Sequence, residues 1–351
     1  MPTTYSFSFD VAAFDIGIII GRFQPFHKAH SALLNHALNN AARVIVVLGS
    51  SLQARSAKNP FSEAERMTMI LSTLTKENQA RIKFITIRDH YDDEAWKQSL
   101  LLAIEAQCTQ QEKIALIGFQ KDASSYYLNF FPNWHFINIT KQGEIDGTKL
   151  RKTYFESPEP QCMRSLFLND LPPTTAQFLD EWQYSDEYKN MKEEYLAIEQ
   201  SKKIWGTGPF ITTDTIVQSC NHVLLIKRKH SPGKGLWAIP GGFLDSHEKI
   251  IDCAIRELQE ETQIPLSKET FVNSLKKVDV FDHPNRSIRG RIITHAYYLN
   301  LNNTSLPAVK GDDDASLACW IPISQLIEME PYFFEDHFKI INHFLAFCLR
   351  K

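Results

Sequence analysis

The sequence predicts an α/β protein with two domains, and three observations support this fold class. The chain has 351 residues, which is long for a single hydrophobic core. Residues 16–48 read as strand, loop, helix and strand, a βαβ unit whose sheet is parallel. Residues 241–265 contain a heavily charged helix that lies between further strand patterns. We therefore expect two α/β domains, each with a site of its own.

The composition excludes several classes of protein. A net charge of −3 and a pI near 6.5 give no basic footprint for nucleic acid. The chain has no run of about 18 apolar residues, so we expect no membrane span, and its N-terminus lacks the basic region of a signal peptide. The six cysteines are scattered without a CxxC pair, which is typical of reduced thiols and argues against structural zinc. We expect a cytoplasmic protein, and a homo-oligomer.

The first predicted site lies where a strand ends and a helix begins. Residues 16–20 and 42–48 are apolar runs rich in β-branched side chains, typical of buried strands, and residues 31–38 between them have helical periodicity. The segment GRFQPFHKAH, residues 21–30, therefore occupies the edge of the sheet where such folds bind phosphates. Its histidines, three residues apart, have a spacing that also suits a metal site or two ordinary surface residues. The arginine beside them favours an anion site, since it supplies fixed charge and each imidazole a donor.

The rest of the first half continues the alternation of helices and strands. Residues 81–87, 113–118 and 134–139 read as strands, and a polar loop at 88–96 leads into a helix. Ser62 and Glu65 have the spacing of a capping box, which predicts a helix start. Residues 145–151, IDGTKLR, read as a turn followed by another helix start.

Three segments of this half resemble one enzyme family. GRFQPFHKAH resembles the HxGH signature of nucleotidyltransferases, in the GRFQPFHxGH form of nicotinamide mononucleotide (NMN) adenylyltransferases, with Ala29 in place of the glycine. Residues 59–66, NPFSEAER, resemble the segment that follows the second strand in that family. Residues 145–151 are similar to its second signature, ISxTxxR, with Asp146 in place of the serine. The resemblance implies a Rossmann-like domain over residues 1–190 that joins NMN and ATP into NAD and pyrophosphate.

The same resemblance implies roles for individual residues. It assigns catalysis to His27, His30 and Arg151. It assigns substrate binding to other positions of the matched segments, Gly21, Arg22, Gln24, Arg66, Thr148 and Lys149. Trp96 is either a stacking partner of the nicotinamide ring or part of the core. Residues 119–127 resemble a substrate loop of the same group, and Mg²⁺ or Mn²⁺ is expected to bridge the triphosphate oxygens.

A helical connection is expected between the two halves. Residues 180–205 are rich in Glu, Lys and Tyr and contain few helix breakers, so we expect one connecting helix, followed by a short break at 206–209. The prolines at 158–160 and 171–173 punctuate the segment before it. We place a helical linker at residues 191–206 and the second domain at 207–351.

The second predicted site lies on the charged helix. Asp245 and Glu248 have the form of a capping box and predict that the helix starts there. Glu257, Glu260 and Glu261 then project from one stripe, as i, i+3 and i+4. Crowded carboxylates repel each other unless a cation lies between them, and hard oxygen ligands suit Mg²⁺ or Mn²⁺. The alternative is an ordinary solvated helix face.

Further strands and polar segments surround this helix. Residues 212–229, 278–282 and 291–301 read as strands. Arg256 is placed to steady one of the acids, with Glu248 as a candidate. Arg286 belongs to a polar patch at 282–291 that suits a substrate phosphate or ribose. Residues 311–314, GDDD, read either as a solvated turn or as the source of a further metal ligand or general base.

Residues 241–265, GGFLDSHEKIIDCAIRELQEETQIP, resemble the Nudix box of pyrophosphohydrolases, with Gln263 where that pattern has glycine. Glycine there would end the helix in a left-handed conformation. We expect Pro265 to end the helix instead, by displacing Ile264 from the helical region. The resemblance implies a Nudix α/β/α sandwich with a mixed sheet. In it the three glutamates hold the metal and catalyse hydrolysis of a nucleoside diphosphate, with ADP-ribose as the implied substrate.

The two motifs, in this order, resemble bifunctional NMN adenylyltransferase/Nudix hydrolases. That resemblance implies ATP, NMN, NAD and ADP-ribose as ligands, and Mg²⁺ or Mn²⁺ in both domains. Three alternatives remain open. The first domain can use another acceptor, the Nudix domain can act on a different nucleoside diphosphate or only sense ADP-ribose, or the Nudix domain can serve only to hold an oligomer together.

Overall fold

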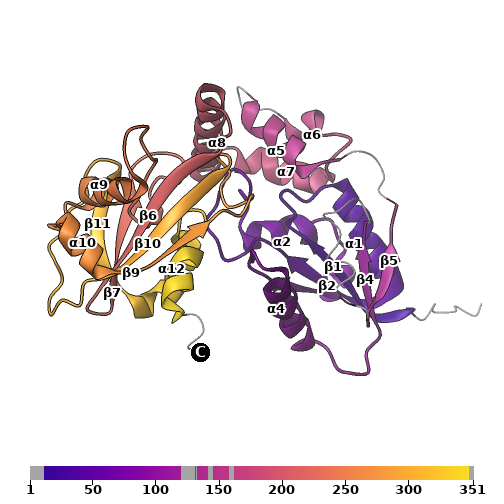
Figure 1. Cartoon of the computed structure of the whole chain (residues 1–351). Coiled ribbons are helices and arrows are strands. Elements are labelled where there is room, and N and C mark those ends of the chain that lie inside the picture. The colour runs from indigo at the N-terminus through magenta and orange to yellow at the C-terminus, as the bar shows by residue number, and fades with distance from the viewer. Residues whose placement is uncertain (1–11, 120–130, 132, 141–144, 158–161, 348–351) are drawn as a thin grey trace, which may run out of the picture. The chain divides into compact units, whose positions relative to one another are not determined.

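The computed structural model describes residues 12–119, 131, 133–140, 145–157 and 162–347 of the chain. It divides the chain into two compact units, Met1–Ser51 with Asn59–Lys189 and Leu52–Lys58 with Asn190–Lys351 (Figure 1). The domain limits expected from the sequence stay a prediction. No helix in the described part of the chain is long and apolar enough to cross a membrane. Residues 120–127 of the expected substrate loop and the prolines at 158 and 160 lie outside the described residues.

The first unit is built on a five-stranded sheet in the order β3-β2-β1-β4-β5. Every neighbouring pair is parallel, which confirms the parallel sheet expected from the βαβ pattern. The strands are β1 Phe14–Gly21, β2 Ala41–Leu48, β3 Ile82–Thr86, β4 Ile114–Gly118 and β5 His135–Asn138.

Helices cover both faces of this sheet. Alternate residues of β1 show the two faces, because successive side chains of a strand point to opposite sides. Ile16 and Ile18 pack in one hydrophobic cluster with Leu100 and Ile104 of α4 (Asp93–Glu105). On the other face, a Cβ atom at Gly17 would lie 3.5 Å from Ala37 of α1 (Lys28–Asn40). The remaining helices of the unit are α2 Glu63–Leu71, α3 Lys76–Ala80, α5 Gly147–Glu156, α6 Met163–Leu166 and α7 Pro173–Trp182.

Two helices replace the single one expected over residues 180–205. α7 ends at Trp182, and α8 (Asp186–Trp205) begins four residues later. The hydroxyl of Ser185 accepts a hydrogen bond from the backbone N–H of Tyr188 at 3.1 Å. A serine in this position caps a new helix. The expectation of one continuous helix was therefore wrong at its start, although α8 itself runs through the expected linker.

The second unit is built on a mixed sheet in the order β11-β7-β6-β10-β9, with β8 paired to β7. β6 and β10 are parallel, while β9, β7 and β11 run antiparallel to their neighbours, which confirms the mixed sheet. The strands are β6 Phe210–Ser219, β7 His222–Arg228, β8 Trp237–Ala238, β9 Leu275–Phe281, β10 Ile292–Asn300 and β11 Ala315–Pro322.

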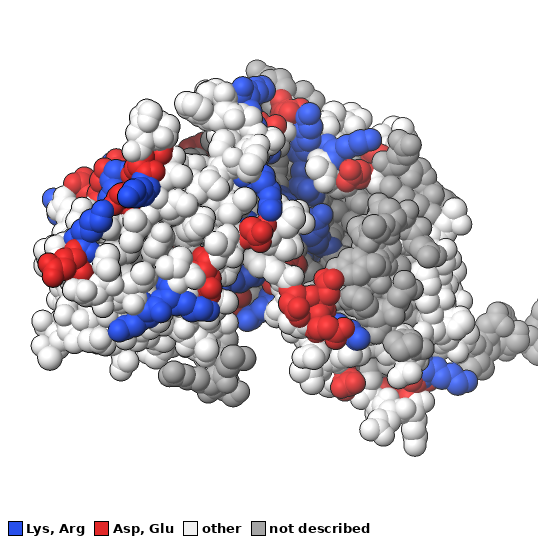
Figure 2. All heavy atoms as spheres, in the orientation of Figure 1, with Lys and Arg blue, Asp and Glu red and all other residues white. Residues whose placement is uncertain are grey.

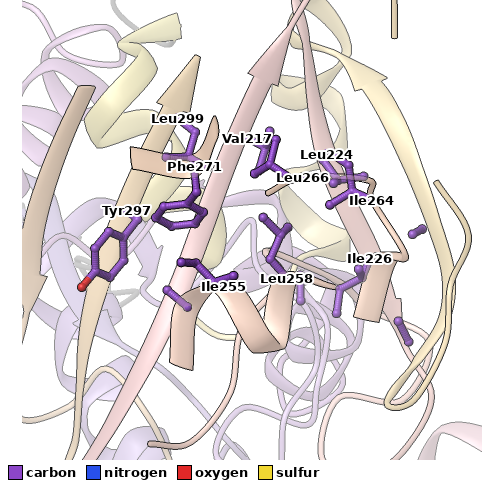
Figure 3. Packing of buried hydrophobic residues seen from close by; sticks show 14 of the residues in the cluster. Val217, Leu224, Ile226, Ile255, Leu258, Ile264, Leu266, Phe271, Tyr297 and Leu299 are labelled. Atoms are coloured by element: carbon purple, nitrogen blue, oxygen red, sulfur yellow. The ribbon is translucent and has the colours of Figure 1, made fainter. Parts of the chain in front are cut away.

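Two hydrophobic clusters hold helices against the two faces of this sheet. Leu258 of α9 (Ile250–Thr262) and Leu224 of β7 belong to one cluster, which Figure 3 shows between the helix and the strands. The next residue of β7, Leu225, belongs to the other cluster, with Ile341 of α12 (His337–Leu345). The unit is thus the expected α/β/α sandwich. Its other helices are α10 Lys268–Ser274 and α11 Leu326–Met329, with 3₁₀ turns at Ile323–Gln325 and Glu330–Tyr332.

Candidate functional site

The first site is organised by two stacked histidines at the amino end of α1. His27 is the N-cap residue, and its Nδ1 accepts the backbone N–H of His30 at 3.4 Å. The Nδ1 of His30 accepts the backbone N–H of His27 at the same distance. The two rings lie 3.6 Å apart between centroids, with 15° between their planes. Because each Nδ1 acts as an acceptor, the neutral rings carry their protons on Nε2, as donors.

Gln24 ties the loop before α1 to two other segments. Its buried side-chain amide donates to the carbonyl of Phe61 at 2.8 Å and accepts the N–H of Phe61 at 2.9 Å. Its own carbonyl accepts a hydrogen bond from Nη1 of Arg151 at 2.6 Å. The loop that follows β1 is thereby fixed to the start of α2 and to α5. Ala29, which replaces the glycine of the signature, is a buried residue of α1.

Arg151 and Thr148 lie on the first turns of α5. Nη2 of Arg151 donates to the Thr148 hydroxyl at 3.2 Å. Burial, assisted by the nearby charge of Arg22, lowers the pKa of Arg151 to about 10, so the guanidinium remains charged at neutral pH. Asp146 is the N-cap residue of α5, and its Oδ1 accepts the N–H of Thr148 at 2.9 Å. The aspartate therefore makes the capping bond that a serine makes at this position.

Arg66 lies in the interior and holds the segments that follow two strands. Its side chain is 1% exposed and donates to the carbonyls of Arg22 at 2.9 Å and Gly49 at 2.6 Å, and to the Ser51 hydroxyl at 2.9 Å. Trp96, on α4, is partly buried and packs against the hydrophobic cluster that includes Leu100 and Ile104. Lys149 is exposed at the start of α5. The structure thus links Arg66 and Arg151 to the loop that carries Arg22 and Gln24.

The second site is organised by Arg256 on α9. Its Nη1 donates to Oε1 of Glu257 at 2.8 Å and to Oε2 of Glu260 at 2.9 Å. Its Nε and Nη2 donate to the two carboxylate oxygens of Glu248, at 3.1 and 2.7 Å, which confirms the expected pairing. These bonds lower the pKa of Glu248 to about 2. Figure 2 shows the resulting mixture of acidic and basic side chains over the part of the face where α9 lies.

Glu261 lies behind this surface, against the two glycines that precede the helix. Its Oε2 accepts the N–H of Gly241 at 2.8 Å, and burial raises the pKa of the carboxyl well above its usual range. Burial likewise raises the pKa of Glu257. A Cβ atom at Gly242 would lie 2.4 Å from the carboxylate carbon of Glu257. The absence of a side chain at Gly242 therefore lets the backbone approach the carboxylate of Glu257.

The donor set of this site fits a divalent metal ion. Among the described residues, no three His, Cys, Asp or Glu side chains converge in ligating geometry. Glu257 and Glu260 nevertheless meet at one cationic nitrogen, Nη1 of Arg256, which marks a point where their oxygens hold positive charge. Burial disfavours the ionised forms of Glu257 and Glu261, and a nearby cation offsets that cost. Carboxylate oxygens are the ligands that Mg²⁺ and Mn²⁺ prefer.

Both ends of α9 differ from expectation. The helix begins at Ile250, not at Asp245. The N–H of Asp245 does donate to Glu248 at 3.0 Å, but that carboxylate is held by Arg256 and the bond closes a turn before the helix. At the other end, Gln263 itself adopts the left-handed conformation, with φ 49° and ψ 25°. The expectation that Pro265 replaces this conformation was wrong.

Gln263 also connects α9 to the acidic loop at 311–314. Its Nε2 donates to Oδ2 of Asp312. The backbone N–H groups of Lys310 and Asp312 donate to the carbonyls of Thr262 at 2.9 Å and Glu261 at 3.3 Å. The loop therefore lies beside the carboxyl end of the helix that carries the glutamates.

The polar patch at 282–291 belongs to a buried network that sequence reasoning missed. Arg286 is buried, and its guanidinium pairs with both carboxylate oxygens of Asp336, at 3.0 and 2.8 Å. Arg289 pairs with Glu335 at 3.0 Å, and His337 accepts the N–H of Ile239 at 3.0 Å. The pair with Asp336 uses Nε and Nη2 of Arg286, and the residue is only 6% exposed, so contact with a substrate would require this buried side chain to become accessible. The partners lie 46 to 98 positions apart in the chain, so no local sequence pattern predicts these contacts.

Comparison with known families gives one match for each unit. The Cytidylyltransferase-like family model matches residues 18–152, and the NUDIX domain model matches residues 209–344. The chain is 38% identical over 192 residues to a nicotinamide/nicotinic acid mononucleotide adenylyltransferase of Acinetobacter baylyi, covering 54% of this chain and 98% of the relative. It is 35% identical over 137 residues to an ADP-ribose pyrophosphatase of Methanocaldococcus jannaschii, covering 39% and 73%.

One kind of solved structure matches along nearly the whole chain. It is a bifunctional NMN adenylyltransferase/ADP ribose pyrophosphatase from Francisella tularensis, complexed with AMP and a manganese ion. The two chains are 33% identical, with a TM-score of 0.85, and the match covers 95% of this chain and 99% of the other. A second structure from the same organism, described without ligands, matches equally well.

Proposed function

The chain belongs to the family of bifunctional NMN adenylyltransferase/ADP-ribose pyrophosphatases, and from this membership we propose how its residues perform two reactions of NAD metabolism. One reaction transfers the adenylyl group of ATP to NMN and yields NAD and pyrophosphate. The other hydrolyses ADP-ribose to AMP and ribose 5-phosphate. The match with the bifunctional structure over 95% of the chain is the observation that carries this function.

In the transferase, the chain aligns two reactants and neutralises charge. The 5′-phosphate of NMN attacks the α-phosphate of ATP, a new O–P bond forms, and pyrophosphate leaves. The Nε2–H groups of His27 and His30 donate hydrogen bonds to phosphate oxygens. Both residues lie at the amino end of α1, where the helix dipole favours negative charge. Arg22, Thr148 and Arg151 add fixed charge and a hydroxyl donor. The hydrogen bonds of Arg66 and Gln24 support this assignment, because they hold the loop that carries both histidines.

In the hydrolase, Glu257, Glu260 and Glu261 would hold the metal ion. Divalent metal use is supported by the manganese ion of the related structure, and we extend it to Mg²⁺ or Mn²⁺ in both units. When bound, such an ion activates water and stabilises the departing phosphate. Arg256 orients two of the glutamates, and the N–H of Gly241 orients the third. Lys149, Gly21, Trp96 and Arg286 keep their proposed binding roles as positions to be tested by substitution.

A product assay tests this function. The intact chain is incubated with Mg²⁺ and either NMN plus ATP or ADP-ribose, and the products are resolved by chromatography. We expect NAD from the first reaction and AMP from the second. His30→Ala should abolish only NAD, and Glu260→Gln only AMP. His36→Ala on the same helix as His30, and Glu269→Gln at an exposed position of α10, serve as matched controls that should change neither product.

The alternatives are not favoured, and the same assay separates them. NAD without AMP would leave a Nudix unit that senses ADP-ribose or cleaves another diphosphate. AMP without NAD would point to a different acceptor in the first unit. We also propose a homo-oligomer, supported by Ile204 and Trp205, which are 60% and 74% exposed at the end of α8. Light scattering coupled to gel filtration tests it against the 40.4 kDa mass of one chain.

A further inference from the structure

An exposed aromatic ring lies at the edge of the carboxylate cluster of the second unit. Phe243 directly follows Gly242, whose backbone approaches the carboxylate of Glu257. The carbonyl of Phe243 accepts a hydrogen bond from Nη2 of Arg256 at 3.2 Å. The backbone of Phe243 is therefore fixed to the same guanidinium that gathers the glutamates. Its ring is nonetheless 47% exposed, although large apolar side chains are usually buried.

A cation lies over this ring. The guanidinium carbon of Arg289 is 5.7 Å from the ring centroid of Phe243 and 5.2 Å from that of Phe334. Arg289 is held in turn by its ion pair with Glu335 at 3.0 Å. The ring of Phe210 meets Phe243 edge to face, with 5.9 Å between centroids. Phe243 is thus an exposed residue whose ring contacts two neighbours and whose backbone carbonyl is bound by Arg256.

We infer that Phe243 stacks on the base of the nucleotide substrate and that Arg289 is a positioning residue for its ring. This inference rests on the proposed hydrolysis of a nucleoside diphosphate. Such a substrate must place its diphosphate at the glutamates, so its base lies a short distance away. Every nucleobase has a flat π-face that can stack on an aromatic side chain. A purine, with two fused rings, covers more of the phenyl group than a pyrimidine and gains more from it.

Kinetics of the intact chain with ADP-ribose test the inference. We compare wild type with Phe243→Leu, which keeps an apolar side chain but removes the ring, and with Phe243→Trp, which enlarges it. We expect Phe243→Leu to raise KM about tenfold with little change in kcat, equivalent to about 1.4 kcal/mol. Phe243→Trp should retain the wild-type KM. Tyr332→Ala is the control, because Tyr332 is a 60% exposed aromatic residue of the same unit that is not part of the site.

Inhibition constants distinguish stacking from a structural role. AMP and ribose 5-phosphate both carry a phosphate, but only AMP carries a base. We expect Phe243→Leu to weaken inhibition by AMP about tenfold and to leave that by ribose 5-phosphate unchanged. Arg289→Gln should weaken inhibition by AMP to a smaller extent. Equal weakening of the two inhibitors, or an unchanged KM, would overturn the inference.

The test also separates the inference from the function on which it rests. If wild type does not hydrolyse ADP-ribose, the proposed activity fails, and AMP is titrated calorimetrically into wild type and Phe243→Leu in the presence of Mn²⁺. Any AMP bound by the first unit contributes equally to both titrations, so the difference belongs to residue 243. Weaker binding of AMP by Phe243→Leu would support stacking even if the chain lacks the proposed activity. Identical titrations would refute stacking.

Discussion

Replacing Gln263 by alanine and, separately, by glycine distinguishes two effects of this residue on the stability of the second unit: the cost of its backbone conformation and the gain from its side-chain hydrogen bond. Gln263 ends α9 with φ 49°, a left-handed conformation that costs a non-glycine residue about 1–2 kcal/mol. Its side chain donates to the carboxylate of Asp312, and a hydrogen bond at such an exposed position contributes on the order of 1 kcal/mol. The backbone cost and the side-chain gain are thus of similar size.

The two variants therefore differ in expected stability. Gln263→Ala keeps the left-handed conformation and loses the hydrogen bond, so we expect it to lower the free energy of unfolding by about 1 kcal/mol. Gln263→Gly loses the same bond but removes the backbone cost. We expect it to lie within about 1 kcal/mol of wild type, and above the alanine variant.

Hydrogen exchange of peptides that cover α9 measures the difference, because exchange reports the free energy of local opening. Asp312→Ala serves as a third variant, since it removes the acceptor and leaves Gln263 in place. Equal protection of the glycine and alanine variants would refute the backbone cost. Wild-type protection in Asp312→Ala would refute the contribution of the hydrogen bond.

Three further substitutions have outcomes that follow from the described contacts. Gly242→Ala places a methyl group 2.4 Å from the carboxylate of Glu257, so product analysis should show loss of AMP formation with NAD formation intact. Arg256→Gln removes the bonds that lower the pKa of Glu248 to about 2. The stability they provide is present above the ordinary glutamate pKa near 4.3 and is lost as pH falls toward 2, so the urea midpoint of wild type should fall more steeply than that of the variant below about pH 5. Ser62→Ala removes the cap of α2 and should cost about 1 kcal/mol in thermal unfolding, whereas an unchanged midpoint would exclude that contribution.

Local chemistry made much of the fold predictable. The β-branched runs mark the buried strands β1 and β2 because apolar β-branched side chains pack well in a sheet covered on both faces. Ser62 and Glu65 form the expected capping box because both bonds join residues three positions apart. The placement of Glu257, Glu260 and Glu261 along one side of a helix follows from helical periodicity alone.

The features that were missed depend on residues distant in sequence. The start of α9 at Ile250 was missed, because Glu248 has the spacing of a capping residue but is held by Arg256, in the one pairing that the sequence did predict. The hydrogen bonds from Arg66 to carbonyls 17 and 44 positions away were not anticipated, and its role in substrate binding stays a prediction. Arg286 pairs with Asp336, which lies 50 positions further along the chain. Such pairings are set by tertiary structure, and no local pattern encodes them.

Arg256 gives the carboxylates of α9 a resident counterion within their own helix. The helix with this acidic face therefore folds without a bound metal ion, unlike small domains whose folding free energy comes from metal binding. Oε1 of Glu257 and Oε2 of Glu260 already bond Arg256, so a divalent ion would share these carboxylates with the guanidinium. At a low concentration of the ion, hydrolysis would then stop while the chain stayed folded, and hydrolysis would return when the ion was supplied again.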